Sequence, residues 1–119
     1  MDSSSFPIDR NHLDDISGGD RQFEAELMQE FVSSARRLLA DLERAIETGD
    51  VAAAQMAVHT LKGSCRSLGA APMAEPCFEI ERMTRTASLE GAADHLREAR
   101  ARYRELCAFI EKTWNVKAA

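Results

Sequence analysis

The fold is decided by residues 21–50, which read RQFEAELMQEFVSSARRLLADLERAIETGD. Apolar side chains recur there every three or four residues, at Phe23, Leu27, Phe31, Ala35, Leu38, Leu42 and Ile46. This spacing places them in one stripe along an α-helix. Asp20 can cap the start of the helix, and Gly49 can end it. The segment therefore predicts a long helix that buries one face in a core.

Three further segments follow the same rule. A helix between Asp50 and Gly69 has its apolar stripe at Ala54, Val58, Leu61, Cys65 and Leu68. A third helix is expected from about Ala74 to Thr86, beginning or kinking near Pro76, with Cys77, Phe78, Ile80 and Met83 facing inward. The last helix begins near Glu90, and its inward side chains are Ala92, Leu96, Ala99, Tyr103, Leu106, Ile110 and Trp114.

A short helix precedes these four. Pro7 and Asp9 open it, it covers about residues 8–17 with Leu13 and Ile16, and Gly18 and Gly19 end it. Strand signals are few, and four helices with short connections can bury their stripes only against one another. We therefore predict an all-α, antiparallel up-down-up-down four-helix bundle over about residues 20–114, with this additional N-terminal helix, in a single domain covering 1–119.

Composition excludes several classes of protein. The net charge is −5, with 20 acidic residues against 15 basic ones, which disfavours a nucleic-acid partner. The sequence contains no apolar run of the roughly 20 residues that a membrane helix needs, and residues 1–10 are polar, so we do not expect a signal peptide. Its three cysteines, Cys65, Cys77 and Cys107, form no disulfide or metal pattern, which favours a reducing compartment. We expect a cytoplasmic protein, most simply a monomer.

His59 faces away from the core of its helix. At roughly 100° per residue it lies about 140° from Ala54, and its neighbours Ala52, Met56 and Gly63 are small or apolar. The exposed arc of a helix normally carries charged residues. Because this arc is small and apolar instead, a partner protein could approach His59 here.

Gly63 and Lys62 make this histidine unusual. Gly63 costs about 1 kcal/mol relative to alanine in the middle of a helix. It follows His59 by four residues, where a side chain would crowd the imidazole. Lys62 can reach the space beside the ring and offset negative charge, and Arg66 adds a weaker basic field. Together these residues suit a phosphorylated histidine.

Each feature alone has an ordinary explanation. An exposed helical histidine is usually a solvated surface residue, and a glycine within a helix usually eases packing. Metal binding is disfavoured because His59 and Cys65 lie roughly 120° apart on their helix and neither is accompanied by an HxxxH or HxxE ligand pair. Cys65 and Cys77 are expected in the core, and His12 and His95 on the surface.

The run 58–70, VHTLKGSCRSLGA, resembles the signature of histidine-containing phosphotransfer (HPt) domains, roughly His-x-Leu-Lys-Gly-small-small-x-x-Leu-Gly. The resemblance extends over nearly the whole chain, from Ile8-Asp9 to the third long helix. It implies that His59 carries a phosphoryl group on Nε2, that Lys62 neutralises it and that Gly63 permits close approach. It further implies that Glu81 binds the other ring nitrogen, with Arg85 as a second candidate.

The resemblance implies a phosphorelay intermediate, which accepts a phosphoryl group from the aspartate of one receiver domain and passes it to another. Its partners would be receiver domains of response regulators or of a hybrid sensor histidine kinase. No cofactor of its own is expected, since the receiver would supply Mg²⁺, and no ATP-binding loop is present, so we expect a phosphocarrier without kinase activity. The expected docking residues are Leu13, Ile16, Ala52, Gln55, Met56 and Arg66.

Two alternatives remain at this point. A helical adaptor could bind receiver domains without carrying phosphate, and it would keep its function after His59→Gln. An autonomous helical enzyme or metal protein would need a ligand set that the sequence does not contain.

Overall fold

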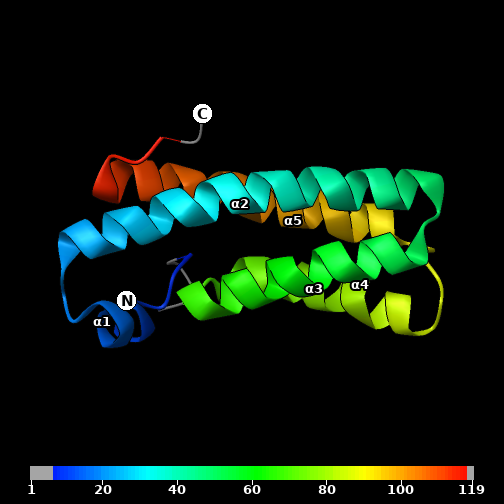
Figure 1. The fold of residues 1–119 in the computed structure, drawn as a ribbon, viewed down its shortest axis with the longest axis horizontal. Helices are drawn as coiled ribbons and strands as arrows, with labels where there is room; N and C mark the ends of the chain where they lie inside the picture. Colours follow the sequence, from blue (N-terminus) through cyan, green and yellow to red (C-terminus); the bar gives the residue numbers. More distant parts are fainter. Residues whose placement is uncertain (1–6, 118–119) are drawn as a thin grey trace.

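The computed structural model describes residues 7–117, in which the regular structure is helical. The helices are α1 (Arg10–Ser17), α2 (Arg21–Thr48), α3 (Val51–Leu68), α4 (Ala71–Arg85) and α5 (Ala92–Trp114). Helices α2 and α4 each pack on both α3 and α5, and α1 lies at the end of the bundle beside the start of α2 (Figure 1). The predicted antiparallel four-helix bundle with a short N-terminal helix is confirmed.

Aspartate caps and left-handed glycines set the helix boundaries. The carboxylate of Asp20 accepts a hydrogen bond from the amide of Phe23, and that of Asp50 accepts one from Ala53. Each bond satisfies an amide that has no partner inside its helix. Gly49 ends α2 with a φ of 72°, a conformation that glycine adopts without the penalty of a Cβ. Because these signals are local, the helix boundaries could be predicted from the sequence.

Helix α4 begins earlier than expected. It starts at Ala71, not near Ala74 or Pro76, and it continues through Pro76. Pro72 lies in the first turn, where a missing N–H removes no helical bond. Pro76 is buried within α4, where its ring takes the place of an N–H that would have donated a helical hydrogen bond. Phe78, expected to face inward, is instead 47% exposed.

The buried face of α2 is rotated from the predicted stripe. Its buried residues are Glu24, Met28, Phe31, Val32, Ala35, Leu39, Leu42 and Ala45. Phe23 is 43% exposed, and Leu27, Leu38 and Ile46 are half-buried. The reason is tertiary: α2 packs on α3 and α5 at the same time, so the buried arc is centred between those two neighbours.

Helix α1 is attached to the end of α3. The amide of Asp9 donates to the carbonyl of Gly69 at 2.8 Å, and the His12 ring contacts the carbonyl of Ser67 through Nε2, also at 2.8 Å. Leu13 is completely buried beneath the helix. One expectation is therefore corrected: Leu13 belongs to the core and offers no docking surface. His12 is partly exposed, as is His95, but it also makes a tertiary hydrogen bond.

A buried carboxylate joins three helices at this end of the bundle. Glu24 on α2 accepts a hydrogen bond from the Ser17 hydroxyl of α1 at 2.6 Å and one from the Trp114 indole of α5 at 3.0 Å. Burial raises the pKa of Glu24, but these two hydrogen bonds and the charges of Arg10 and Arg21 outweigh it, so the net pKa is below its ordinary value.

Three further observations concern the classes of protein considered above. Cys65 and Cys77 are buried in the core as expected, and all three cysteines are free thiols. Across residues 7–117, no helix combines the length and the hydropathy needed to cross a bilayer. Within the same residues, no group of three or more His, Cys, Asp or Glu side chains could hold a metal ion.

Candidate functional site

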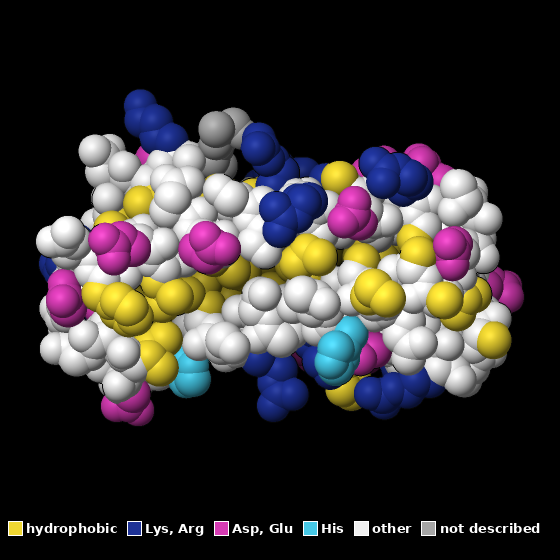
Figure 2. Space-filling model, viewed as in Figure 1, with side chains coloured by type: hydrophobic (Ala, Val, Ile, Leu, Met, Phe, Trp, Pro, Cys, Tyr) yellow, Lys and Arg dark blue, Asp and Glu magenta, His cyan; other side chains and the backbone are white. Residues whose placement is uncertain are grey.

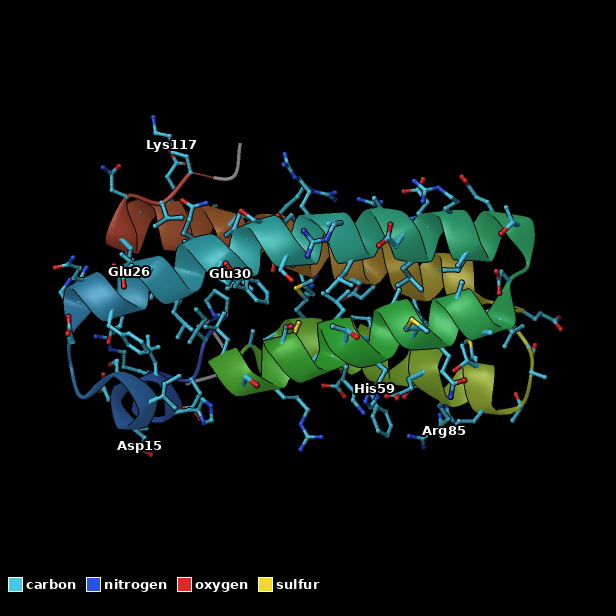
Figure 3. All side chains as sticks on the ribbon, in the orientation of Figure 1. Asp15, Glu26, Glu30, His59, Arg85 and Lys117 are labelled. Carbon is cyan, nitrogen blue, oxygen red and sulfur yellow. The ribbon has the colours of Figure 1, made fainter. Side chains whose placement is uncertain are left out.

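His59 lies on the exposed side of α3, held at one nitrogen. Its side chain is 69% exposed, and Nδ1 lies 2.6 Å from Oε2 of Glu81 on α4. A carboxylate can only accept a hydrogen bond, so Nδ1 carries the proton and donates it to Glu81. The neutral ring therefore has its lone pair on Nε2. His59 and Arg85 lie on the same side of the bundle, along α3 and α4 (Figure 3).

Glu81 is the buried centre of this site. Its Oε1 lies 2.6 Å from Nζ of Lys62, and its Oε2 lies 4.0 Å from Nη2 of Arg85. Burial raises the pKa of Glu81, but the hydrogen bonds and charges of Lys62 and His59 outweigh burial, so the pKa stays below its ordinary value. Glu81 is therefore an anion at neutral pH and can fix the orientation of both partners.

Lys62 is more confined than its sequence position indicated. Its side chain is 12% exposed, and its ammonium group lies between Glu81 and the ring of Phe78, 5.7 Å from the ring centroid. Four residues expected from the sequence, His59, Lys62, Glu81 and Arg85, thus meet in one cluster built from α3 and α4.

Gly63 opens the surface one turn along α3 from His59. A Cβ placed on Gly63 would meet no other atom within 4 Å, apart from its own helix and chain neighbours. A methyl group at this position would therefore not touch the imidazole, and the expected crowding by a longer side chain stays a prediction. The space above Gly63 is empty within the chain, so any requirement for glycine comes from a molecule that approaches from outside.

An apolar groove, here called the α1–α3 groove, runs beside Gly63. It has a volume of about 660 Å³ and includes Ile16 of α1, Phe23 of α2 and Thr60 and Gly63 of α3. Figure 2 shows hydrophobic side chains gathered in a band along this face of the molecule. Phe23 was missed as a surface residue because its spacing matched the core stripe, and only the rotation of α2 exposes it.

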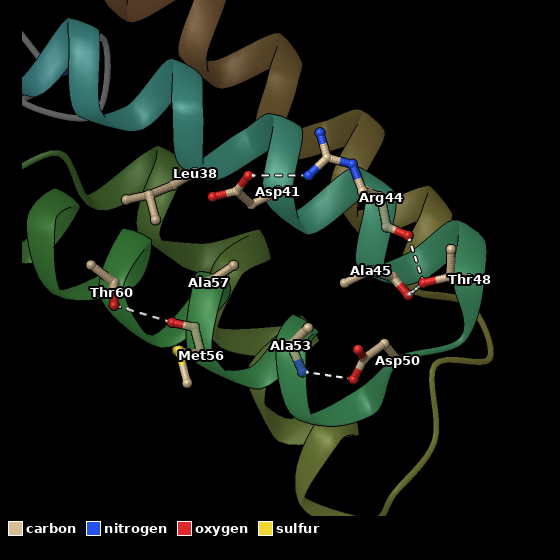
Figure 4. Close-up of a pocket in the computed structure, with 10 residues that line it drawn as sticks. All are labelled: Leu38, Asp41, Arg44, Ala45, Thr48, Asp50, Ala53, Met56, Ala57 and Thr60. Atoms are coloured by element: carbon tan, nitrogen blue, oxygen red, sulfur yellow. Dashed lines mark hydrogen bonds and ion pairs between the residues drawn. The ribbon is translucent and has the colours of Figure 1, made fainter.

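A second groove, here called the α2–α3 groove, lies on the same side of α3 as Met56. Its floor is apolar, with Leu38, Ala53 and Ala57, and an ion pair of Asp41 with Arg44 lies at its edge (Figure 4). Thr60 lines both grooves. Of the docking residues expected from the sequence, Ile16, Ala52, Gln55, Met56 and Arg66 are exposed and Leu13 is not.

Known proteins share both the sequence pattern and the fold. Residues 26–112 match the Hpt domain family, and because this match covers most of the chain, the chain belongs to that family. A curated relative, the phosphorelay intermediate protein rdeA of Dictyostelium discoideum, is 26% identical over 111 residues. The aligned part is 91% of this chain but 44% of that protein, so the chain spans less than half of this relative's length.

Two solved structures have the same architecture. Histidine-containing phosphotransfer protein B (HptB) from Pseudomonas aeruginosa PAO1 superimposes with a TM-score of 0.86 at 21% identity, covering 92% of this chain and 95% of that one. A rice structure described as a histidine-containing phosphotransfer protein gives a TM-score of 0.82 at 21% identity, covering 94% and 82%. At this level of identity the likeness establishes the fold.

Proposed function

We propose that this chain is a phosphocarrier of a two-component phosphorelay, which accepts a phosphoryl group on His59 from the aspartate of one receiver domain and passes it to another. The observation that carries the proposal is the contact between Nδ1 of His59 and the buried Glu81 carboxylate, because it leaves Nε2 as the nucleophile on the exposed side. Membership of the Hpt domain family and the curated phosphorelay relative support it.

The transfer step needs one nucleophile and one fixed tautomer. The lone pair of Nε2 attacks the phosphorus of a receiver aspartyl phosphate, the bond from phosphorus to the aspartate oxygen breaks, and its electron pair leaves with the carboxylate. Nδ1 keeps its proton, and the positive charge that develops on the ring is stabilised by Glu81 at 2.6 Å. The reverse sequence passes the phosphoryl group to a second receiver domain.

The charges around His59 suit a bound phosphoryl group. Lys62 and Arg85 together carry one positive charge more than Glu81 carries negative charge. Phosphoryl transfer depends mainly on positioning and on neutralising the equatorial oxygens. We assign this neutralisation to Lys62 first and to Arg85 second, since the Arg85 side chain is 59% exposed and can turn toward the ring.

The partner would dock over the small and apolar surface beside His59. The α1–α3 groove with Ile16 and Phe23 would take the apolar part of a receiver domain, and Gly63 would let its phosphorylated loop reach Nε2. Ala52, Gln55, Met56 and Arg66 would form the remainder of the contact. The receiver would bring Mg²⁺, and ATP would not be the direct phosphoryl donor.

We further propose that the protein acts as a monomer in the cytoplasm, where its free thiols stay reduced.

The experiment is phosphorylation by a panel of phosphorylated receiver domains, scored as acid-labile, base-stable phosphate on this chain. Wild type and His95→Gln should be labelled and His59→Gln should not, since His95 lies on α5 outside the cluster. Label on His59→Gln would place the phosphate elsewhere. Absence of label from a receiver that binds the wild type would favour the adaptor alternative.

A further inference from the structure

Phe78 is an exposed aromatic residue beside the His59 site, and the proposed chemistry gives it no role. Its side chain is 47% exposed on α4, three residues before Glu81 and therefore on the same part of the helix surface. A single exposed phenylalanine is ordinary. What distinguishes Phe78 is its neighbour, because the Lys62 ammonium lies 5.7 Å from the centroid of its ring.

The contact between Lys62 and Phe78 has the geometry of a cation–π interaction. A lysine ammonium within about 6 Å of a ring centroid is attracted by the negative face of the ring. The same ammonium lies 2.6 Å from Oε1 of Glu81, so Lys62 is held by a carboxylate and by an aromatic ring at the same time. These two contacts account for the low exposure of an otherwise flexible side chain, 12%.

Two carboxylates besides Glu81 line a third groove, which Lys62 also lines. Asp9 near α1 and Glu75 on α4 line, with Lys62, Arg66 and Phe78, a groove of about 460 Å³ between the end of α3 and the start of α4. Without the ring, the ammonium could turn toward these carboxylates or toward solvent. It would then leave Glu81 and the side of the imidazole.

We propose that Phe78 is a positioning residue, whose ring face holds the Lys62 ammonium beside Glu81 so that it can neutralise a phosphoryl group on His59. This inference rests on the proposed function. It assigns no contact between Phe78 and the phosphoryl group, so the residue acts only through Lys62.

The consequence is a longer lifetime of the phosphohistidine. In hydrolysis the bond from phosphorus to Nε2 breaks, its electron pair returns to the ring nitrogen, and water supplies the oxygen of the inorganic phosphate. In the loose transition state the phosphoryl group is metaphosphate-like, so its equatorial oxygens together carry less negative charge than those of the bound phosphoryl dianion. A cation held beside those oxygens therefore stabilises the bound phosphoryl group more than it stabilises the transition state. Displacement of this cation should speed the decay of phosphohistidine.

The test uses phosphoramidate as a small donor, which needs no partner protein, and follows the decay of phosphohistidine by phosphorus NMR after the donor is removed. Phe78→Leu, which keeps apolar bulk but removes the ring, should decay about three-fold faster than wild type. Phe78→Tyr should restore the wild-type rate. Phe109→Leu, which removes a ring on α5, is the matched control and should decay like wild type.

Two further measurements separate the outcomes. Phe78→Leu should remove the ring-current shift of the Lys62 ε-methylene protons in the unphosphorylated protein, and it should add nothing to the decay rate of Lys62→Ala. Equal decay of wild type and Phe78→Leu, or an effect that persists in Lys62→Ala, would overturn this inference and leave the proposed function standing. Failure of the wild type to form phosphohistidine with any donor would overturn both.

Discussion

Gly63 is a residue for which packing within the chain gives no reason. The position is in the interior of α3, where glycine is unfavourable, and a Cβ there would touch no other part of the chain. Intramolecular packing therefore offers no reason for glycine. Close approach by another molecule, as proposed for the receiver domain, would give a reason for glycine at this position.

Substitutions of Gly63 should separate stability from transfer. Gly63→Ala should raise the free energy of unfolding by about 1 kcal/mol, because alanine is the better helix former and nothing opposes its methyl group. Gly63→Arg should leave the fold intact but slow transfer from a receiver domain strongly, with phosphorylation by phosphoramidate unchanged. Urea denaturation and transfer kinetics measure the two effects. Wild-type transfer by Gly63→Arg would contradict the close-approach role.

At the scale of elements, the place of α1 depends on the end of α3. Gly69 has a φ of 83°, and an added Cβ would lie 3.1 Å from Cδ2 of His12 and 3.3 Å from Cβ of Asp9. The absence of a side chain lets α1 rest directly on this turn. Since α1 supplies Ile16 to the α1–α3 groove, the same turn positions part of the proposed docking surface.

Gly69→Ala should therefore loosen α1, and Gly49→Ala is its matched control. Gly49 has a similar φ of 72°, but a Cβ there would meet nothing within 4 Å. We expect a loss of about 1 kcal/mol for Gly49→Ala from backbone strain alone and about 2 kcal/mol for Gly69→Ala, where α1 must also move.

Amide hydrogen exchange in α1 gives the second measurement. The amide of Leu13 donates a hydrogen bond to the carbonyl of Asp9, and Gly69→Ala should speed exchange at this amide. Equal destabilisation by both variants, with unchanged exchange in α1, would show that α1 does not depend on this turn.

At the scale of the whole molecule, two buried carboxylates couple folding to pH. Glu24 joins α1, α2 and α5 at one end, and Glu81 joins α3 and α4 at the site. The pKa of each is below its ordinary value of 4.5 despite burial, because hydrogen bonds and nearby cations favour the charged form. In the unfolded chain both groups return to their ordinary pKa.

The sign of the pH dependence follows from this difference. The unfolded state binds protons first as the pH falls, so the contribution of each carboxylate is complete above pH 4.5 and is lost as the pH falls through the lower pKa of the folded state. Glu24→Gln and Glu81→Gln should each be less stable than wild type at pH 7, and the difference should shrink in acid. Urea denaturation between pH 7 and pH 2 measures it.

Glu47→Gln, an exposed position on α2, is the control and should follow the wild-type curve. A difference between wild type and Glu24→Gln or Glu81→Gln that stays constant down to pH 2 would contradict this linkage.

The sequence by itself determined the class of fold and the centre of the site. Period-3.6 apolar stripes, aspartate caps and glycine ends are local properties, so four long helices and their short connections could be predicted from them. His59, Lys62 and Gly63 lie within one turn and a half of a helix, and their shared face therefore follows from spacing alone. Glu81 and Arg85 came only from the family resemblance.

The tertiary structure decided everything that depends on how helices face one another. The rotation of α2 exposes Phe23 and buries Glu24, because a helix with two packing partners buries the arc between them, which no single-helix pattern shows. Lys62 lies against Glu81 and Phe78 only because α3 packs on α4. Spacing along the chain defines a face of one helix, whereas the partner of that face is set by the packing of the whole core.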